Sequence, residues 1–80
     1  MGERAPAAGE SKQHLRLIVN GESCIVAAGL TVHGFLQSLG LVPAMIVVER
    51  NLEILDRDWY DTTVLVSGDR LELVHFVGGG

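Results

Sequence analysis

The sequence predicts one small α+β domain in which a single main helix packs on a four- to five-stranded mixed sheet. The chain has 80 residues, of which 48% are apolar and 20% charged, a composition typical of a folded domain with one hydrophobic core. Segments with the two-residue period of a strand lie on both sides of one segment with a helical period. Both kinds of secondary structure are therefore expected.

The first two strands form a β-hairpin. Apolar side chains alternate with others along His14–Val19, and Asn20-Gly21 follows. Both turn residues accept a positive φ, which two-residue hairpin turns require. A second strand through Cys24–Val26 then returns antiparallel to the first. Leu15, Leu17 and Val19 share one face of the first strand.

The main helix is predicted from Val32 to about Leu39. Thr31 is placed to cap its first turn, and Gly40 provides a left-handed stop. The apolar residues of the segment have the spacing of one helical face, and all four are expected to be buried: Val32, Phe35, Leu36 and Leu39.

A central strand and a less regular region follow the helix. Met45–Val48 is apolar at consecutive positions, as expected of a central strand that is covered on at least part of both faces, and Asn51 marks a turn. Residues 52–63 predict a short strand and a one-turn helix, with Ile54 and Trp59 as apolar anchors among acidic residues.

The last predicted strand is Arg70–Phe76, and it begins after a turn at Ser67–Asp69. Its residues alternate between two faces, with Leu71, Leu73 and His75 on one face and Glu72, Val74 and Phe76 on the other. The order of strand, strand, helix, strand, short elements and strand is that of a β-grasp domain.

Composition and charge exclude several classes of function. The net charge of −4 lies in residues 14–80 and disfavours a nucleic-acid partner. Two arginines against five acids between Glu49 and Asp61 favour a solvated acidic surface, with steering toward a basic partner as the alternative. No apolar run approaches the roughly 18 residues of a membrane span. The apolar-poor first residues and the single cysteine, Cys24, predict a cytoplasmic protein.

The sequence contains few candidate catalytic residues, so we expect a protein that is not an enzyme. His14, His33 and His75 lie far apart and lack metal-ligand spacing, so each is interpreted as structural and no metal is expected. Cys24 lies in an apolar strand and is interpreted as a small buried hydrophobe. Solvated carboxylates give no reason for a raised pKa.

The chain closes with three glycines directly after a strand. A glycine-rich terminus by itself favours a frayed end. The alternative is a slender arm that carries a free carboxylate at Gly80 into a narrow channel. Because a carboxylate is a poor acyl donor, such an arm requires activation by another protein, most simply as an acyl-adenylate made with ATP.

Motifs along residues 15–80 support the second interpretation of the tail. Together they resemble the ThiS family of sulfur carrier proteins of thiamine biosynthesis, which is ubiquitin-like and has the β-grasp fold. The closing stretch is the most specific part. The resemblance rests on Val19–Glu22, Thr31-Val32, Leu36, Leu39–Leu41, Val47–Asn51, Ile54–Arg57, Trp59 and Gly68–Gly80.

This resemblance implies that a ThiF-type enzyme adenylates Gly80, which is then converted to a thiocarboxylate. Thiazole synthase, the ThiG partner, would take that sulfur for the thiazole ring, and a cysteine desulfurase route would supply it. Gly78 and Gly79 would form the arm, while Phe76 and Val77 would dock beside the partner's channel. No stably bound cofactor is implied, because the activating partner uses the ATP, and we expect a monomer.

The resulting domain prediction is a disordered leader (1–13), a β-grasp domain (14–77) and a flexible tail (78–80). Rival functions are a sulfur carrier for molybdopterin or cysteine synthesis, a ubiquitin-like modifier conjugated through Gly80, and an interaction module with an inert tail. Lys12 is the only lysine and lies in the leader. Chains linked through lysines of the folded domain are therefore excluded, which favours a carrier.

Overall fold

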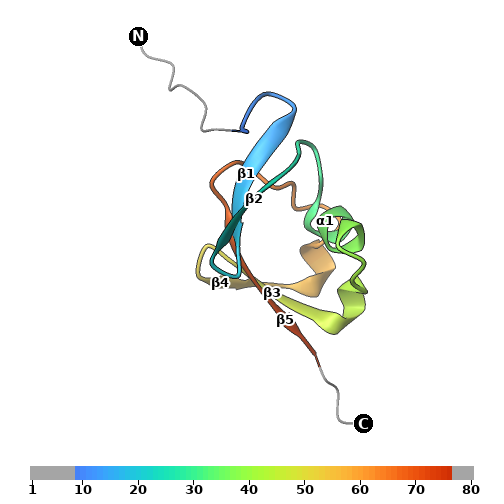
Figure 1. Cartoon of the computed structure of the whole chain (residues 1–80). Helices are drawn as coiled ribbons and strands as arrows, with labels where there is room; N and C mark the ends of the chain where they lie inside the picture. Colours follow the sequence, from blue (N-terminus) through green and yellow to red (C-terminus); the bar gives the residue numbers. More distant parts are fainter. Residues whose placement is uncertain (1–8, 77–80) are drawn as a thin grey trace.

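The structure, a computed structural model, describes residues 9–76 and has the predicted α+β, β-grasp architecture. Five strands form one mixed sheet in the order β2-β1-β5-β3-β4, in which β1 and β5 are parallel and the other pairs antiparallel. One helix lies beside the sheet (Figure 1). The elements are β1 (His14–Val19), β2 (Glu22–Ala27), α1 (Val32–Ser38), η1 (Pro43–Met45), β3 (Ile46–Arg50), β4 (Glu53–Leu55), η2 (Arg57–Trp59) and β5 (Arg70–His75).

The first hairpin forms as predicted. Asn20 and Gly21 have φ of 50° and 84°, the left-handed pair that lets a two-residue turn follow the twist of its strands. Asn20 also joins this turn to β5: its N–H donates to the carbonyl of Leu71, and its Oδ1 accepts from the N–H of Leu73 at 2.8 Å. The hairpin is therefore fixed to the strand that leads toward the C-terminus.

Helix α1 has the predicted cap and stop. Thr31 Oγ1 accepts from the N–H of Gly34 at 3.0 Å, and Gly40 has φ of 76°. The N–H of Gly40 donates to Gln37 and that of Leu41 to Leu36, which is the Schellman pattern. The expectation that Leu39 is buried was wrong. It follows the last helical residue with φ −88° and ψ 2°, so its side chain leaves the buried stripe and is half-exposed.

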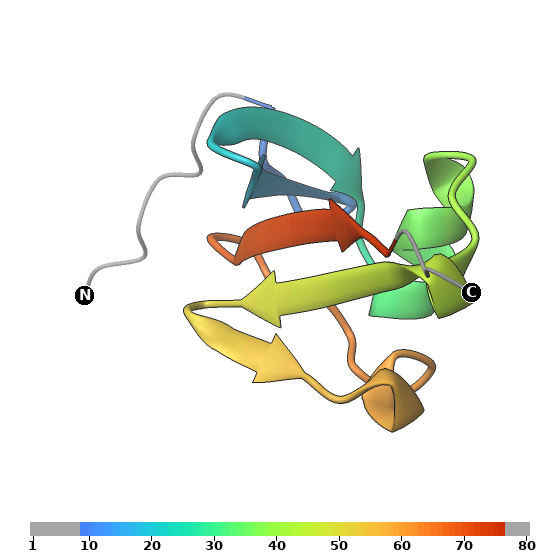
Figure 2. The same cartoon turned by 90° about the horizontal axis from the view of Figure 1, so that it is seen from below.

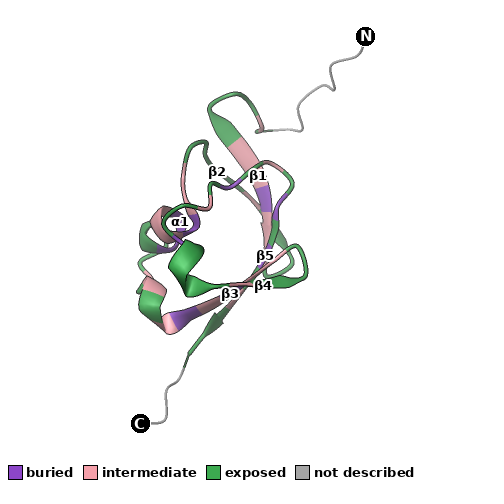
Figure 3. Cartoon of the chain, turned by 180° about the vertical axis from the view of Figure 1, so that it is seen from behind, coloured by how far each residue is buried: buried purple, intermediate pink, exposed green. Residues whose placement is uncertain are grey.

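The core lies between α1 and one face of the sheet, and no helix of residues 9–76 covers the other face, which we call the open face. Figure 2 shows the five strands side by side from β2 (teal) to β4 (gold), and in Figure 3 the buried stretches of α1, β1 and β3 are drawn in purple. The buried hydrophobic residues are Leu17, Val32, Phe35, Leu36, Ile46, Val48, Tyr60, Leu65 and Leu71.

The predicted short strand and one-turn helix between residues 52 and 63 are present as β4 and η2, but their predicted anchors were wrong. Ile54 and Trp59 are exposed, and Tyr60 is buried instead. The Tyr60 hydroxyl donates to the carbonyl of Ile46 at 2.7 Å and accepts from the N–H of Val48 at 3.1 Å. Because β4 is too short to pair the whole of β3, this hydroxyl satisfies backbone groups that would otherwise be buried without partners.

Several boundaries differ from the prediction. β2 is longer than the predicted Cys24–Val26, and β3 continues past Val48 to Arg50. β3 begins at Ile46 because Pro43–Met45 form a 3₁₀ turn, and β5 ends at His75 rather than Phe76. Before β1, Gly9 lies against the side chain of Ile25, and the Ser67 hydroxyl is hydrogen-bonded to the Glu10 carboxylate. The disordered leader stays a prediction for residues 1–8, which lie outside the described residues.

Candidate functional site

The predicted functional tail lies at the limit of what the structure describes. Val77, Gly78, Gly79 and Gly80 are outside the described residues, and Phe76 is the last residue within them. The described part of the candidate site is therefore the end of β5 and the sheet surface around it.

Phe76 is attached to the sheet through its backbone and leaves its ring at the surface. Its N–H donates to the carbonyl of Met45, one position beyond the last β3–β5 pair, Ile46 with His75. The predicted alternation along β5 is only partly reflected in burial. Leu71 is buried and Leu73 packs against the core, but His75 is exposed near the end of the strand.

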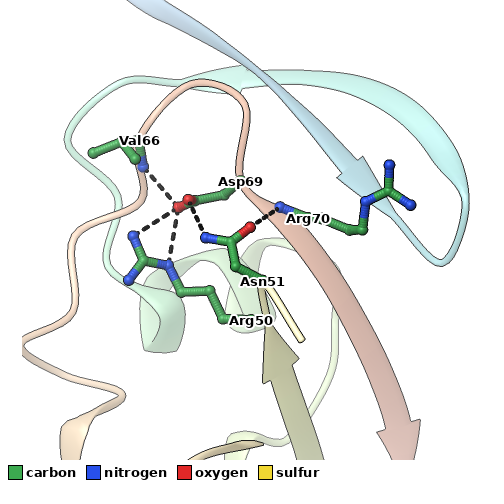
Figure 4. A network of polar contacts seen from close by, with 5 residues as sticks. All are labelled: Arg50, Asn51, Val66, Asp69 and Arg70. Atoms are coloured by element: carbon green, nitrogen blue, oxygen red, sulfur yellow. Dashed lines mark hydrogen bonds and ion pairs between the residues drawn. The ribbon is translucent and has the colours of Figure 1, made fainter. Parts of the chain in front are cut away.

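The start of β5 is held by a buried carboxylate. Asp69 is 3% exposed, and its Oδ2 accepts from Arg50 Nε at 3.1 Å and Nη2 at 3.0 Å, and from the N–H of Val66 at 2.9 Å. Its Oδ1 accepts from Asn51 Nδ2, whose own Oδ1 accepts from the N–H of Arg70. Figure 4 shows the Asp69 carboxylate at the centre of this network.

The network joins the β3–β4 turn to the loop before β5, and both neighbours of β5 then pair with it. β1 lies parallel on one side and β3 antiparallel on the other, so β5 is an interior strand with a fixed direction. This network was not predicted from the sequence. The sequence features that could have indicated it are Asp69 in a predicted turn and the Arg50-Asn51 pair, which lies 18 to 19 positions earlier.

The open face of the sheet carries exposed apolar residues next to the end of β5. Ile54 is 74%, Val74 59% and Phe76 51% exposed, and Val47 lies directly opposite Val74 in the β3–β5 register. We call Val47, Ile54, Val74 and Phe76 the open-face patch. A surface hollow of about 280 Å³ adjoins it, lined by Val47, Ile54, Leu55, Asp56, Arg57 and Tyr60.

The histidines and the cysteine are not brought together. His33 Nδ1 lies 3.5 Å from Asp61 Oδ1, and His14 contacts Ser11. Cys24 was predicted to be buried, but it is only partly buried beside the core. Desolvation by this burial raises the pKa of its thiol.

Within residues 9–76, no group of three or more His, Cys, Asp or Glu side chains could hold a metal ion. No helix in that part of the chain is long and apolar enough to cross a membrane.

Comparison with known proteins decides the family. A sequence model of the ThiS family matches residues 14–80, which include the whole sheet, α1 and the glycine tail. The chain belongs to the ThiS family. The match confirms the resemblance inferred from the motifs.

Curated relatives of this ThiS family member are of two kinds. It is 42% identical over 50 residues, 62% of its own length, to the sulfur carrier protein ThiS of Bacillus subtilis, of which it covers 76%. It is also 41% identical over 66 residues to a thiazole synthase of Magnetococcus marinus. The alignment covers 82% of this chain but only 20% of that thiazole synthase.

Solved structures agree with the family and the fold. The crystal structure of the thiamine biosynthesis protein (ThiS) from Geobacter metallireducens superposes with a TM-score of 0.70 and 38% sequence identity. The superposition covers 82% of this chain and all of that one. An NMR structure of a thiamine biosynthesis protein from the same organism gives a TM-score of 0.67 and covers 88% of that chain.

Proposed function

We propose that this chain is a non-enzymatic sulfur carrier whose Gly80 carboxylate is converted to a thiocarboxylate that supplies sulfur to thiazole synthase. The observation that carries the proposal is the family match, which extends through the closing glycines to residue 80. Similarity to a protein named as a sulfur carrier and to proteins named thiazole synthases supports both halves of it.

The chemistry requires two displacements at the end of the tail. The Gly80 carboxylate first attacks the α-phosphate of ATP on a ThiF-type enzyme, and pyrophosphate leaves. A sulfur nucleophile at the oxidation level of hydrosulfide then attacks the carbonyl carbon and displaces AMP. It forms when a thiol reductant cleaves the persulfide that a cysteine desulfurase route supplies. The thiocarboxylate product is ionised at neutral pH and is more polarisable than a carboxylate, so it can attack an electrophilic carbon of the thiazole precursor.

The fold suits a protein whose C-terminus is modified by other proteins. β5 is interior to the sheet and fixed at its start by Asp69, so it presents its far end in a constant direction. A glycine arm has no side chains and fits a narrow channel. Activation needs ATP and a reduced sulfur source, which supports our proposal that the chain acts in the cytoplasm.

Intact-mass analysis tests the proposal. After incubation with the ThiF-type enzyme, ATP and a sulfur donor, the chain should gain the mass difference between one sulfur and one oxygen atom. Omitting ATP is the control, and it should leave the mass unchanged. Higher-mass protein conjugates without that gain would instead favour a ubiquitin-like modifier.

The acceptor is tested separately. The thiocarboxylate form should support thiazole formation by thiazole synthase in the absence of any other sulfur source. The mass gain could occur while only a molybdopterin or cysteine synthesis system accepts the thiocarboxylate sulfur. In that case the chain is a sulfur carrier for that other pathway.

A further inference from the structure

Two carboxylates face each other within the open face of the sheet. Glu49 of β3 and Glu72 of β5 are direct partners in the antiparallel register, so their Cβ atoms lie roughly 5 Å apart. Like charges placed directly opposite each other on one face destabilise a sheet. The pair thus lowers the stability of the free domain.

This carboxylate pair adjoins the open-face patch. Val47 and Val74 form the next pair on the same face, two positions along each strand, and Ile54 of β4 lies opposite Glu49 on its other side. A glutamate pair at this position is therefore bordered by apolar side chains on two sides.

No cation of the described residues neutralises the pair. Arg50 is bound to Asp69 on the other face, and Arg16 Nη1 donates to Ser23. Arg70 lies two positions before Glu72 on the same face, yet no ion pair joins it to Glu49 or Glu72 within residues 9–76. Among residues 9–76, neither Glu49 nor Glu72 takes part in an ion pair.

We propose that the open-face patch docks on thiazole synthase, which inserts one arginine or lysine between Glu49 and Glu72. The proposal rests on the proposed function. An exposed apolar surface of this kind is typical of a protein interface, and an acidic centre selects a basic residue on the partner while it repels phosphate groups. An arginine suits the position best, because its planar guanidinium can donate to both carboxylates.

The position of the tail supports the same partner. Phe76 belongs to the patch, and Gly80 follows it by four residues, so a fully extended arm reaches at most about 14 Å beyond Phe76. A protein that covers the patch therefore holds its sulfur acceptor within that radius. The ThiS-like segment also occurs within longer relatives named thiazole synthases, which favours this occupant over other proteins that bind the tail.

The proposal predicts opposite changes in stability and in affinity. Glu49→Gln, Glu72→Gln and the double variant remove repulsion in the free chain, so each should raise the midpoint of thermal unfolding. The same changes remove the counter-charges for the partner's cation. The double variant should bind thiazole synthase at least about tenfold more weakly in calorimetry at low salt.

Glu22→Gln is the matched control. It makes the same change in net charge, but Glu22 pairs with Val19 on the other face of the sheet at the far edge strand. Its affinity should equal that of the unsubstituted chain. Glu72→Lys should give a still higher thermal midpoint and still weaker binding, because it creates an internal ion pair with Glu49.

Unchanged affinity in the double variant, or an equal loss in Glu22→Gln, would overturn the proposal. The proposed function is judged by a different measurement, the mass gain at Gly80. A chain that acquires sulfur normally but binds thiazole synthase independently of Glu49 and Glu72 contradicts this inference alone. A chain that never acquires sulfur contradicts the proposed function.

Discussion

The two ends of β5 differ in whether their charged groups have partners within the chain and whether their apolar side chains are buried. At the start of the strand, the buried Asp69 carboxylate has an arginine, an amide and a backbone N–H as partners. At the far end, Val74 and Phe76 are exposed and Glu72 faces Glu49. The first region has its partners within the chain, whereas the second leaves apolar side chains exposed and places two carboxylates opposite each other.

This difference shows how one strand can serve both fold and function. The matched end fixes where β5 begins and which way it points, and the cost of burying a charge is offset by its partners. The end near Phe76 tolerates exposed apolar side chains and the repulsion between Glu49 and Glu72 because it lies outside the core. Substitutions at the two ends should therefore separate stability from partner binding.

Removal of Gly80 should have the largest effect on function and almost none on stability. The arm becomes shorter by one residue, roughly 3.5 Å, so sulfur transfer to thiazole synthase should be lost. The buried core lies between Leu17 and Leu71, so the thermal midpoint should not change. A transfer assay and thermal unfolding measure the two effects.

Deletion of Gly2 is the matched control, since it removes the same residue type from the other end. It should leave transfer intact. A large drop in the thermal midpoint on removing Gly80 would contradict the interpretation of the tail as an arm outside the core.

Asp69→Ala should cause the largest loss of stability among these changes. It leaves the Arg50 guanidinium without its counter-charge and the N–H of Val66 without its acceptor. Loss of one member of a buried pair costs about 3 kcal/mol, and urea unfolding should show a decrease of that order.

Asp58→Ala provides the comparison for Asp69, because Asp58 is an exposed aspartate in η2. Its effect on the free energy of unfolding should stay within about 0.5 kcal/mol. Equal effects of the two substitutions would show that the buried network does not fix the start of β5.

Phe76→Glu should weaken partner binding more than folding. The ring is half-exposed, and its removal leaves the backbone N–H that donates to Met45. Loss of an aromatic anchor from an interface costs about 2 kcal/mol, or roughly thirtyfold in the affinity for thiazole synthase measured by calorimetry. Val42→Glu, at an exposed valine after α1, should not change that affinity. Collapse of the fold in Phe76→Glu would place the ring in the core and refute the docking prediction.

Elements with local signals were predictable from the sequence, and contacts between distant segments were not. Asn20-Gly21, Thr31 and Gly40 act on their own neighbours, so the first hairpin and the helix were found. The Asp69 network depends on which of several carboxylates is buried, and no local pattern encodes that. Tyr60 was missed in favour of Trp59 because hydropathy ignores the hydroxyl, whose two hydrogen bonds to β3 determine which ring is buried.

For the candidate site, the sequence indicated the tail and Phe76 through the family motif. The Glu49–Glu72 pair could not be found in this way, because it follows from the β3–β5 register. Strand register depends on how the whole sheet packs.

The turn between β3 and β4 provides the smallest predicted effect. Asn51 and Leu52 have φ of 50° and 74°, the same left-handed pair of conformations as Asn20 and Gly21, but with a leucine where the first hairpin has glycine. A left-handed conformation costs a residue with a Cβ roughly 1 kcal/mol. Leu52 is 82% exposed, so packing in the free chain offsets little of that strain.

Leu52→Gly should therefore raise the free energy of unfolding by about 1 kcal/mol in urea titrations. Gly21→Ala is the reciprocal control: nothing lies within 4 Å of the added Cβ, so only the conformational strain should appear, as a decrease of similar size. Opposite shifts in the two turns would assign both effects to the backbone conformation. A loss of stability in Leu52→Gly would mean that the leucine side chain makes a contribution that exceeds the strain it imposes.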